Sequence, residues 1–153
     1  MTQKGDLTVS VEENTALARR VMADLVNTGN MALVDELVAP DFVRHDLGGG
    51  PDIVGPEGVK LFVAALRAAF PDIQMTIEDI IAEGDKLAVR YTARGTHSGE
   101  IQGIAPTGRK VTWAGINIYR REGGKVVETW QLRDGLGLMQ QLGVVPLIGQ
   151  ARG

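Results

Sequence analysis

The hydrophobic pattern of this 153-residue chain changes once, near residue 73, and that change constrains the fold more than any other feature. Before it, apolar residues recur at helical spacing in three segments; after it, the chain is rich in β-forming residues. Short turns separate most of the β-rich runs, which favours antiparallel pairing. The runs are 73–83, 87–96, 110–121 and 125–133. Helices gathered early and strands gathered late predict an α+β domain with helices packed on one face of a curved antiparallel sheet.

Start and stop signals delimit the three helices. Ser10 and Glu13 fit a capping box, so the first helix is expected to begin there and to end just before Asn30. A second, shorter helix is expected to run from Asn30, as its cap, through Leu33 and Leu37 to Pro40. The third is expected to open at Pro56, because proline suits the first helical turn, and Pro71 prevents its continuation.

Length and composition favour one soluble domain over residues 1–153. The chain is 44% hydrophobic, which allows one sizeable core. A net charge of -3 without a basic cluster argues against nucleic acid as a partner. The chain has no cysteine, which excludes disulfides and thiolate chemistry and is compatible with a reducing compartment. No run approaches the ~20 apolar residues of a membrane span, and no signal peptide is visible, so a cytoplasmic protein is expected.

Large apolar side chains occur on both faces of the predicted strands. A sheet that is apolar on both faces must be covered on both. The helices cover one face, and the other would present Ile116, Ile118 and Trp130. We therefore expect a homodimer formed through this outer face.

Five segments in a fixed order carry a resemblance to a known family. They are VNTGN at 26–30, APDFVRH at 39–45, GTHSG at 95–99, PTGR at 106–109, and a closing segment that runs from GGKVVETWQLRD to QQLG at 123–143. Over about residues 12–146 the chain resembles the SnoaL-like polyketide cyclases, also called ester cyclases. The resemblance implies an α+β barrel, or cone, of the type shared with nuclear transport factors, ketosteroid isomerases and limonene-epoxide hydrolases.

The resemblance also implies a chemistry. In this family a mostly apolar pocket between helices and sheet holds a polyketide ester while an intramolecular aldol condensation closes a ring. The reaction needs a base that removes a carbon-bound proton and a donor that stabilises the enolate. No metal or organic cofactor is implied. The expected partner is a hydrophobic, oxygenated small molecule.

Two positions depart from the family pattern. When the closing strand is matched on Lys125 and Asp134, the catalytic aspartate of the family falls on Gln131 and its histidine partner on Asn117. Both replacements are amides, which can orient or polarise a carbonyl but cannot take up a proton near neutral pH. General base catalysis, worth ~10²–10⁴-fold, therefore requires another group.

The segment Arg44-His45-Asp46 is the first candidate for that group. A histidine beside an aspartate supplies a base that titrates near neutral pH and a carboxylate to orient it. The alternative is a solvated strand end. Because side chains alternate along a strand, Arg44 and Asp46 should share one face, with Arg44 available to bind substrate, while His45 points to the other.

Four further residues are candidates for the pocket. Arg90 is expected to neutralise developing charge and to pair with Asp46 or a substrate oxygen, or else to extend from the sheet edge into solvent. His97 is interpreted first as a structural residue that closes its turn, with substrate binding as the alternative. Trp113 and Tyr119 are expected to form pocket wall.

Three functions remain open from the sequence. The first is cofactor-independent acid/base ring closure in a cyclase-like enzyme. The second is a non-catalytic ligand-binding or accessory protein that has kept the pocket and lost the carboxylate. The third is epoxide hydrolysis, because an arginine on the strand of Arg90 activates water, together with two carboxylates, in the epoxide hydrolases of this fold. The fold alone does not choose among them.

Overall fold

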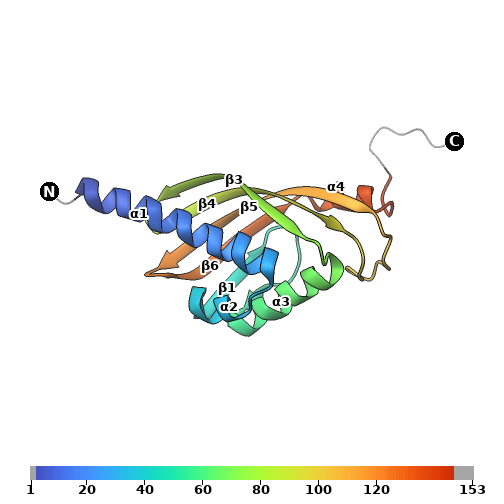
Figure 1. Ribbon diagram of the computed structural model, residues 1–153, viewed down its shortest axis with the longest axis horizontal. Helices are drawn as coiled ribbons and strands as arrows, with labels where there is room; N and C mark the ends of the chain where they lie inside the picture. Colours follow the sequence, from blue (N-terminus) through green and yellow to red (C-terminus); the bar gives the residue numbers. More distant parts are fainter. Residues whose placement is uncertain (1–2, 147–153) are drawn as a thin grey trace.

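The computed structural model describes residues 3–146 and the side chains of residues 11–146 (Figure 1). Its helices are α1 (Gln3–Ala18), the π-helical continuation η1 (Arg19–Val26), α2 (Ala32–Leu37), α3 (Gly55–Ala69) and α4 (Gly135–Gln141). Its strands are β1 (Val38–Asp46), β2 (Ile53–Val54), β3 (Gln74–Glu83), β4 (Lys86–Thr96), β5 (Lys110–Glu122) and β6 (Lys125–Arg133).

The six strands form one open sheet in the order β2-β1-β6-β5-β4-β3. Strands β3 to β6 pair antiparallel with their sequence neighbours, as the short turns between β3 and β4 and between β5 and β6 predict, although a longer loop connects β4 to β5. Figure 1 shows α1, α2 and α3 on the same side of this curved sheet. The α+β architecture expected from the sequence is confirmed.

The first strand pair was not expected. Strand β1 lies parallel to β6, and the short β2 pairs antiparallel with β1, so the sheet is mixed rather than wholly antiparallel. Residues 38–46 include a proline and four charged or titratable side chains, and they lack the β-branched run that marks the later strands. Pairing with β6 determines their structure, and this long-range contact leaves no local sequence signal.

The first two helices differ from the sequence prediction at their ends. Helix α1 already includes Gln3, so Ser10 lies inside a helix and the predicted capping box is wrong. No proline interrupts the preceding residues, and the helix simply continues through them. Helix α2 ends at Leu37, before Pro40, because Val38 already has the extended backbone of β1. Its N-cap is Met31 rather than Asn30, although the Asn30 side chain accepts a hydrogen bond from the backbone N–H of Ala32 at 3.2 Å.

The end of η1 is fastened to both the sheet and α3. The Asn27 side chain donates to the carbonyl of Met75 at 3.1 Å and accepts from the Met75 N–H at 2.7 Å. This side-chain amide therefore makes the same two hydrogen bonds to the edge strand β3 that a neighbouring strand would make. Arg67 of α3 donates to the carbonyls of Val26 and Asn27, each at 2.8 Å. These contacts hold η1 over the sheet, where it forms one wall of a cavity.

The core lies between the helices and the inner face of the sheet. Residues such as Val34, Val89 and Phe70 are fully buried there. No helix within residues 3–146 is long and apolar enough to cross a membrane.

Candidate functional site

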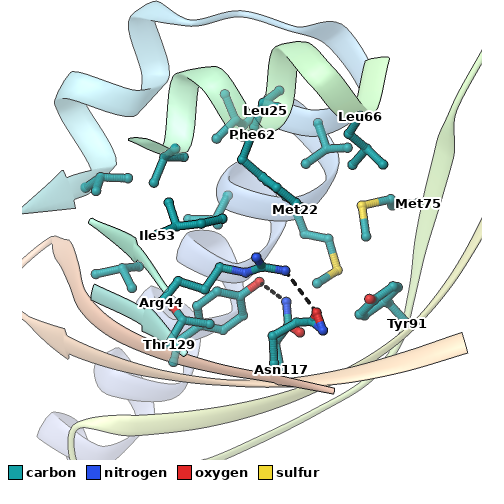
Figure 2. A pocket seen from close by; sticks show the side chains of 18 of the residues that line it. Met22, Leu25, Arg44, Ile53, Phe62, Leu66, Met75, Tyr91, Asn117 and Thr129 are labelled. Atoms are coloured by element: carbon teal, nitrogen blue, oxygen red, sulfur yellow. Dashed lines mark hydrogen bonds between the residues drawn. The ribbon is translucent and has the colours of Figure 1, made fainter. Parts of the chain in front are cut away.

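A cavity opens between the helical layer and the inner face of the sheet (Figure 2). Leu25 of η1 and Phe62 and Leu66 of α3 belong to its apolar wall. The side chains of Met22 and Met75 also line it, and flexible methionines let such a wall adapt to a ligand. The cavity is large enough to hold several water molecules.

The polar floor of the cavity comes from alternate residues of neighbouring strands. Asn117 on β5 lies opposite Gln131 on β6, and Tyr119 lies opposite Thr129. All four are buried, and all four line the cavity. The period of two along each strand places them on one face, so the spacing in the sequence is what brings them together.

Strand β1 completes the floor from the other side of β6. Its register places Arg44 beside Thr129 and Asp46 beside Gln131. Arg44 lines the cavity and donates from Nη2 to Gln131 Oε1 at 2.9 Å, while its guanidinium lies 4.3 Å from the centre of the Phe62 ring (Figure 2). Burial lowers the pKa of Arg44, and attraction to Asp46 is among the effects that raise it, so the group stays charged at neutral pH.

Asp46 occupies the end of β1. It is not among the residues that line the cavity, but its register partner Gln131 is. Its Oδ1 accepts a hydrogen bond from the N–H of Gly48 at 2.8 Å, and the glycine-rich segment that follows adds no side chain in front of it. The carboxylate therefore lies next to the polar floor, on the same face as Arg44.

Three floor atoms have no hydrogen-bond partner among the described atoms. They are Gln131 Nε2, Asn117 Oδ1 and Thr129 Oγ1. Gln131 is only 1% exposed, and a buried polar atom without a partner is costly. The cavity thus offers a bound molecule one amide donor, one amide acceptor and one hydroxyl.

The two tyrosines of the cavity remain protonated. Burial raises the pKa of Tyr119 to about 12, and its oxygen accepts a hydrogen bond from Asn117 Nδ2 at 3.0 Å. Burial also raises the pKa of Tyr91. Both phenols can donate to a ligand oxygen at neutral pH.

His45 points away from the cavity, as strand alternation predicts. On the outer face its Nε2 lies 2.7 Å from Glu128 Oε2, and its ring stacks on Trp130 with 5.7 Å between ring centres. The hydrogen bond with His45 lowers the pKa of Glu128. The hypothesis that His45 moves a proton in the pocket therefore conflicts with its position.

Arg90 is also on the outer face, and the expectation that it lies in the pocket is wrong. Its Nε donates to Asp79 Oδ2 at 2.7 Å, and its side chain is 53% exposed. Its partner is thus a neighbour on β3 rather than Asp46. Alternation along β4 turns Arg90 outward because Val89 and Tyr91 point inward.

His97 is buried but does not line the cavity, so its placement fits the structural interpretation rather than substrate binding. Its Nδ1 accepts from the N–H of Thr107 at 3.2 Å, and its backbone carbonyl accepts from Gly108 at 2.8 Å. These contacts close the loop between β4 and β5. Trp113 and Tyr119, by contrast, do line the cavity.

Sequence reasoning did not select two of the polar cavity residues, Tyr91 and Arg133. Arg133 shares the strand period of Gln131, so that period was the available signal. Tyr91 required the register of β4 against β5. Within the part of the chain that the structure describes, no three His, Cys, Asp or Glu side chains are grouped to hold a metal ion.

Comparisons with known proteins agree with this architecture. The family model of the SnoaL-like polyketide cyclases matches residues 16–142. Aklanonic acid methyl ester cyclase AcmA of Streptomyces galilaeus is 28% identical over 87% of this chain and 92% of its own length. Aklanonic acid methyl ester cyclase DnrD of Streptomyces peucetius is 30% identical over 83% of this chain and 88% of its own.

Solved structures of similar proteins share this fold. AclR of Streptomyces galilaeus, a candidate hydroxylase, aligns with a TM-score of 0.78 at 31% identity over 91% of this chain and 86% of its own. IdmH of Streptomyces antibioticus, a candidate polyketide cyclase, aligns with a TM-score of 0.68 at 37% identity over 79% of this chain and 92% of its own. Because the family model covers most of the sequence, this chain belongs to the SnoaL-like polyketide cyclase family.

Proposed function

We propose that this protein catalyses an acid/base ring closure of the aldol type on a hydrophobic, oxygenated substrate such as a polyketide or related ester. The observation that supports the proposal most strongly is the floor of the cavity. There a charged guanidinium and an unpartnered amide N–H, from Arg44 and Gln131, lie together under an apolar wall. Donors fixed in a water-poor site stabilise negative charge far better than donors in water.

In this proposal the donors bind the oxygen that becomes negative. When a carbon-bound proton leaves the substrate, its electron pair delocalises onto the adjacent carbonyl oxygen as an enolate. Arg44 and Gln131 Nε2 donate to that oxygen, and Asn117 orients the substrate through its free Oδ1. The amides that replace the carboxylate and histidine of the family thus bind and polarise, and they move no proton.

The proton carrier in this proposal is Asp46. Its carboxylate takes the proton as the enolate forms; the enolate carbon then bonds to a second carbonyl carbon, and the resulting alkoxide takes the proton back. The support is positional, since Asp46 shares a face with Arg44 and lies beside Gln131 across the β1–β6 pair. Among the described carboxylates, only Asp46 has a register partner in the polar floor.

A pair of adjacent variants tests this assignment. Ring closure of an aromatic polyketide, supplied as the methyl ester and as the matching acid, is followed by chromatography against chemical standards. Asp46→Asn should lower turnover by ~10²–10⁴-fold, the usual contribution of a general base. His45→Ala, one residue away on the outer face, should stay within a few-fold of the natural protein. If Asp46→Asn turns over normally, Asp46 is not the base.

A non-catalytic binding protein is the second candidate, because the amides at 117 and 131 cannot act as bases. Tight binding of the same substrates without chemical change, also in the presence of candidate partner enzymes, would favour it. Epoxide hydrolysis was considered because of Arg90, and that reason no longer applies, since Arg90 pairs with Asp79 on the face opposite the cavity.

We further propose that the outer face of the sheet binds a second copy of the chain. One row of neighbours runs from Ile81 through Ile118 to Trp130, and the adjacent row holds Ile116 and Leu132. Ile81 is 72% exposed, and Ile116 and Leu132 are each 51% exposed. A continuous apolar patch of this kind typically marks an interface.

The charges around this patch suit a symmetric partner. The ion pairs Arg90–Asp79 and Arg120–Glu128 place both signs at its margin, so two copies related by a two-fold axis can match opposite charges. Sedimentation equilibrium at micromolar concentration should give a dimer, and Ile116→Lys should give a monomer. A monomeric natural protein would exclude this interface.

A further inference from the structure

The cavity contains two arginines and no carboxylate. Arg44 and Arg133 both line it, whereas none of the described lining residues is an aspartate or a glutamate. The whole chain carries a net charge of -3, so this local excess of positive charge runs against the composition. A cationic cavity in an acidic protein indicates an anionic ligand.

No acidic side chain among the described residues balances the charge of Arg133. Among side chains 11–146 it takes part in no ion pair, unlike Arg90 and Arg120. It is close enough to Arg44 that repulsion between the two lowers the pKa of Arg44, although burial is the larger cause. The Asp46 carboxylate attracts Arg44 but forms no ion pair with either arginine among the described residues, so both guanidiniums remain available to an anion.

The register shows where that anion would lie. Arg133 pairs with Gly115 on β5, and Gly115 pairs with Tyr91 on β4. On its other side, the backbone N–H of Leu47 donates to the carbonyl of Gln131 at 2.9 Å, which places the glycine-rich segment 48–50 beside the end of β6. Arg133 therefore lines the same cavity as Tyr91, two strands away, and Gln131, whose Nε2 has no partner among the described atoms.

We propose that this cavity selects substrates that carry a free carboxylate, with Arg133 as the residue that recognises it and Arg44 left for the enolate oxygen. The inference rests on the proposed function and specifies its substrate class. The proposed substrate class differs from that of relatives whose names give a methyl ester as substrate. An ester oxygen carries no net charge and would leave Arg133 without its counterion.

A pair of small, unreactive probes tests the inference independently of turnover. The probes are 2-naphthoate and methyl 2-naphthoate, which differ only in the charge and size of one group, and binding is measured by isothermal titration at neutral pH. A charge-assisted hydrogen bond in a buried site corresponds to about 10- to 100-fold in affinity. The natural protein should therefore bind the acid about 10- to 100-fold more tightly than the ester.

Variants assign that preference to one side chain. Arg133→Gln should abolish the preference for the acid while leaving ester affinity within a few-fold, and Arg133→Lys should retain most of it. Arg94→Gln, an equal loss of charge at an exposed position of β4, should change neither affinity. Equal affinities for acid and ester in the natural protein, or a preference that survives Arg133→Gln, would overturn the inference. Absence of ring closure would not, because the probes undergo no reaction.

Discussion

Replacing Arg44 with methionine separates the catalytic contribution of this side chain from its structural one. Methionine has a similar length and keeps the apolar contact with the helical wall, but it removes the charge. The variant loses one charge-assisted hydrogen bond to Gln131, worth about 1.5–3 kcal/mol. It also loses the contact with the face of Phe62, worth about 1 kcal/mol.

An opposing effect limits the cost to stability. Arg44 is a partly buried cation without a carboxylate within ion-pair distance among the described residues, and removing such a cation relieves a desolvation penalty of about 2–3 kcal/mol, less than for a fully buried ion. The loss of the hydrogen bond and the Phe62 contact is therefore largely offset by the relief of the desolvation penalty. We therefore expect the free energy of unfolding, measured by urea titration, to change by less than about 2 kcal/mol.

Turnover should respond much more strongly. Removing one donor from an oxyanion site commonly lowers the rate by ~10²–10³-fold, and Arg44 also positions the second donor, Gln131. Single-turnover ring closure should fall by at least ~10²-fold, while Arg94→Met on the outer face should leave it unchanged. A folded Arg44→Met protein that closes the ring within about threefold of the natural rate would refute the oxyanion role.

Three further predictions concern the frame of the cavity. Gly115→Ala would place its Cβ against the Tyr91 hydroxyl and should cost about 1–3 kcal/mol of stability, and Tyr91→Phe should recover part of it in a double-mutant cycle. Because burial raises the pKa of Tyr119 to about 12, its contribution to stability should be complete below pH 10 and fall as the pH rises toward 12. In Tyr91→Phe, where Tyr119 is the only tyrosine, spectrophotometric titration should show almost no tyrosinate at pH 10.5, and substantial tyrosinate there in folded protein would contradict the burial argument. Asn27→Ala removes both hydrogen bonds to Met75 and should lower the free energy of unfolding by about 1–3 kcal/mol; a change below about 0.5 kcal/mol would show that this amide does not fasten η1 to β3.

The parts of the fold that depend on local pattern could be predicted from the sequence. The four long strands and helix α3 lie within a residue or two of their predicted ranges, because alternation, turn glycines and proline act over a few residues. The extent and pairing of strand β1 could not be predicted in the same way. Its structure depends on parallel pairing with β6, more than 80 residues later in the chain.

The same distinction applies to the site. Alternation correctly placed Arg44 and His45 on opposite faces and identified the face of Gln131 and Asn117. Alternation along β4 also favours an outward Arg90, because Val89 and Tyr91 have the opposite parity, and only the resemblance to epoxide hydrolases placed this arginine in the pocket. The same period places Arg133 on the face of Gln131, but the absence of a carboxylate among the described residues that line the cavity is visible only in three dimensions.

The central claim is that ring closure proceeds with an amide at position 131. The measurement that tests it most directly is turnover of an aromatic polyketide, as methyl ester and as free acid, by the natural protein beside Gln131→Asp. The account predicts that the natural protein closes the ring, and that Gln131→Asp is slower because its carboxylate would neutralise Arg44. If only Gln131→Asp closes the ring, the pocket has lost its base and the account is contradicted.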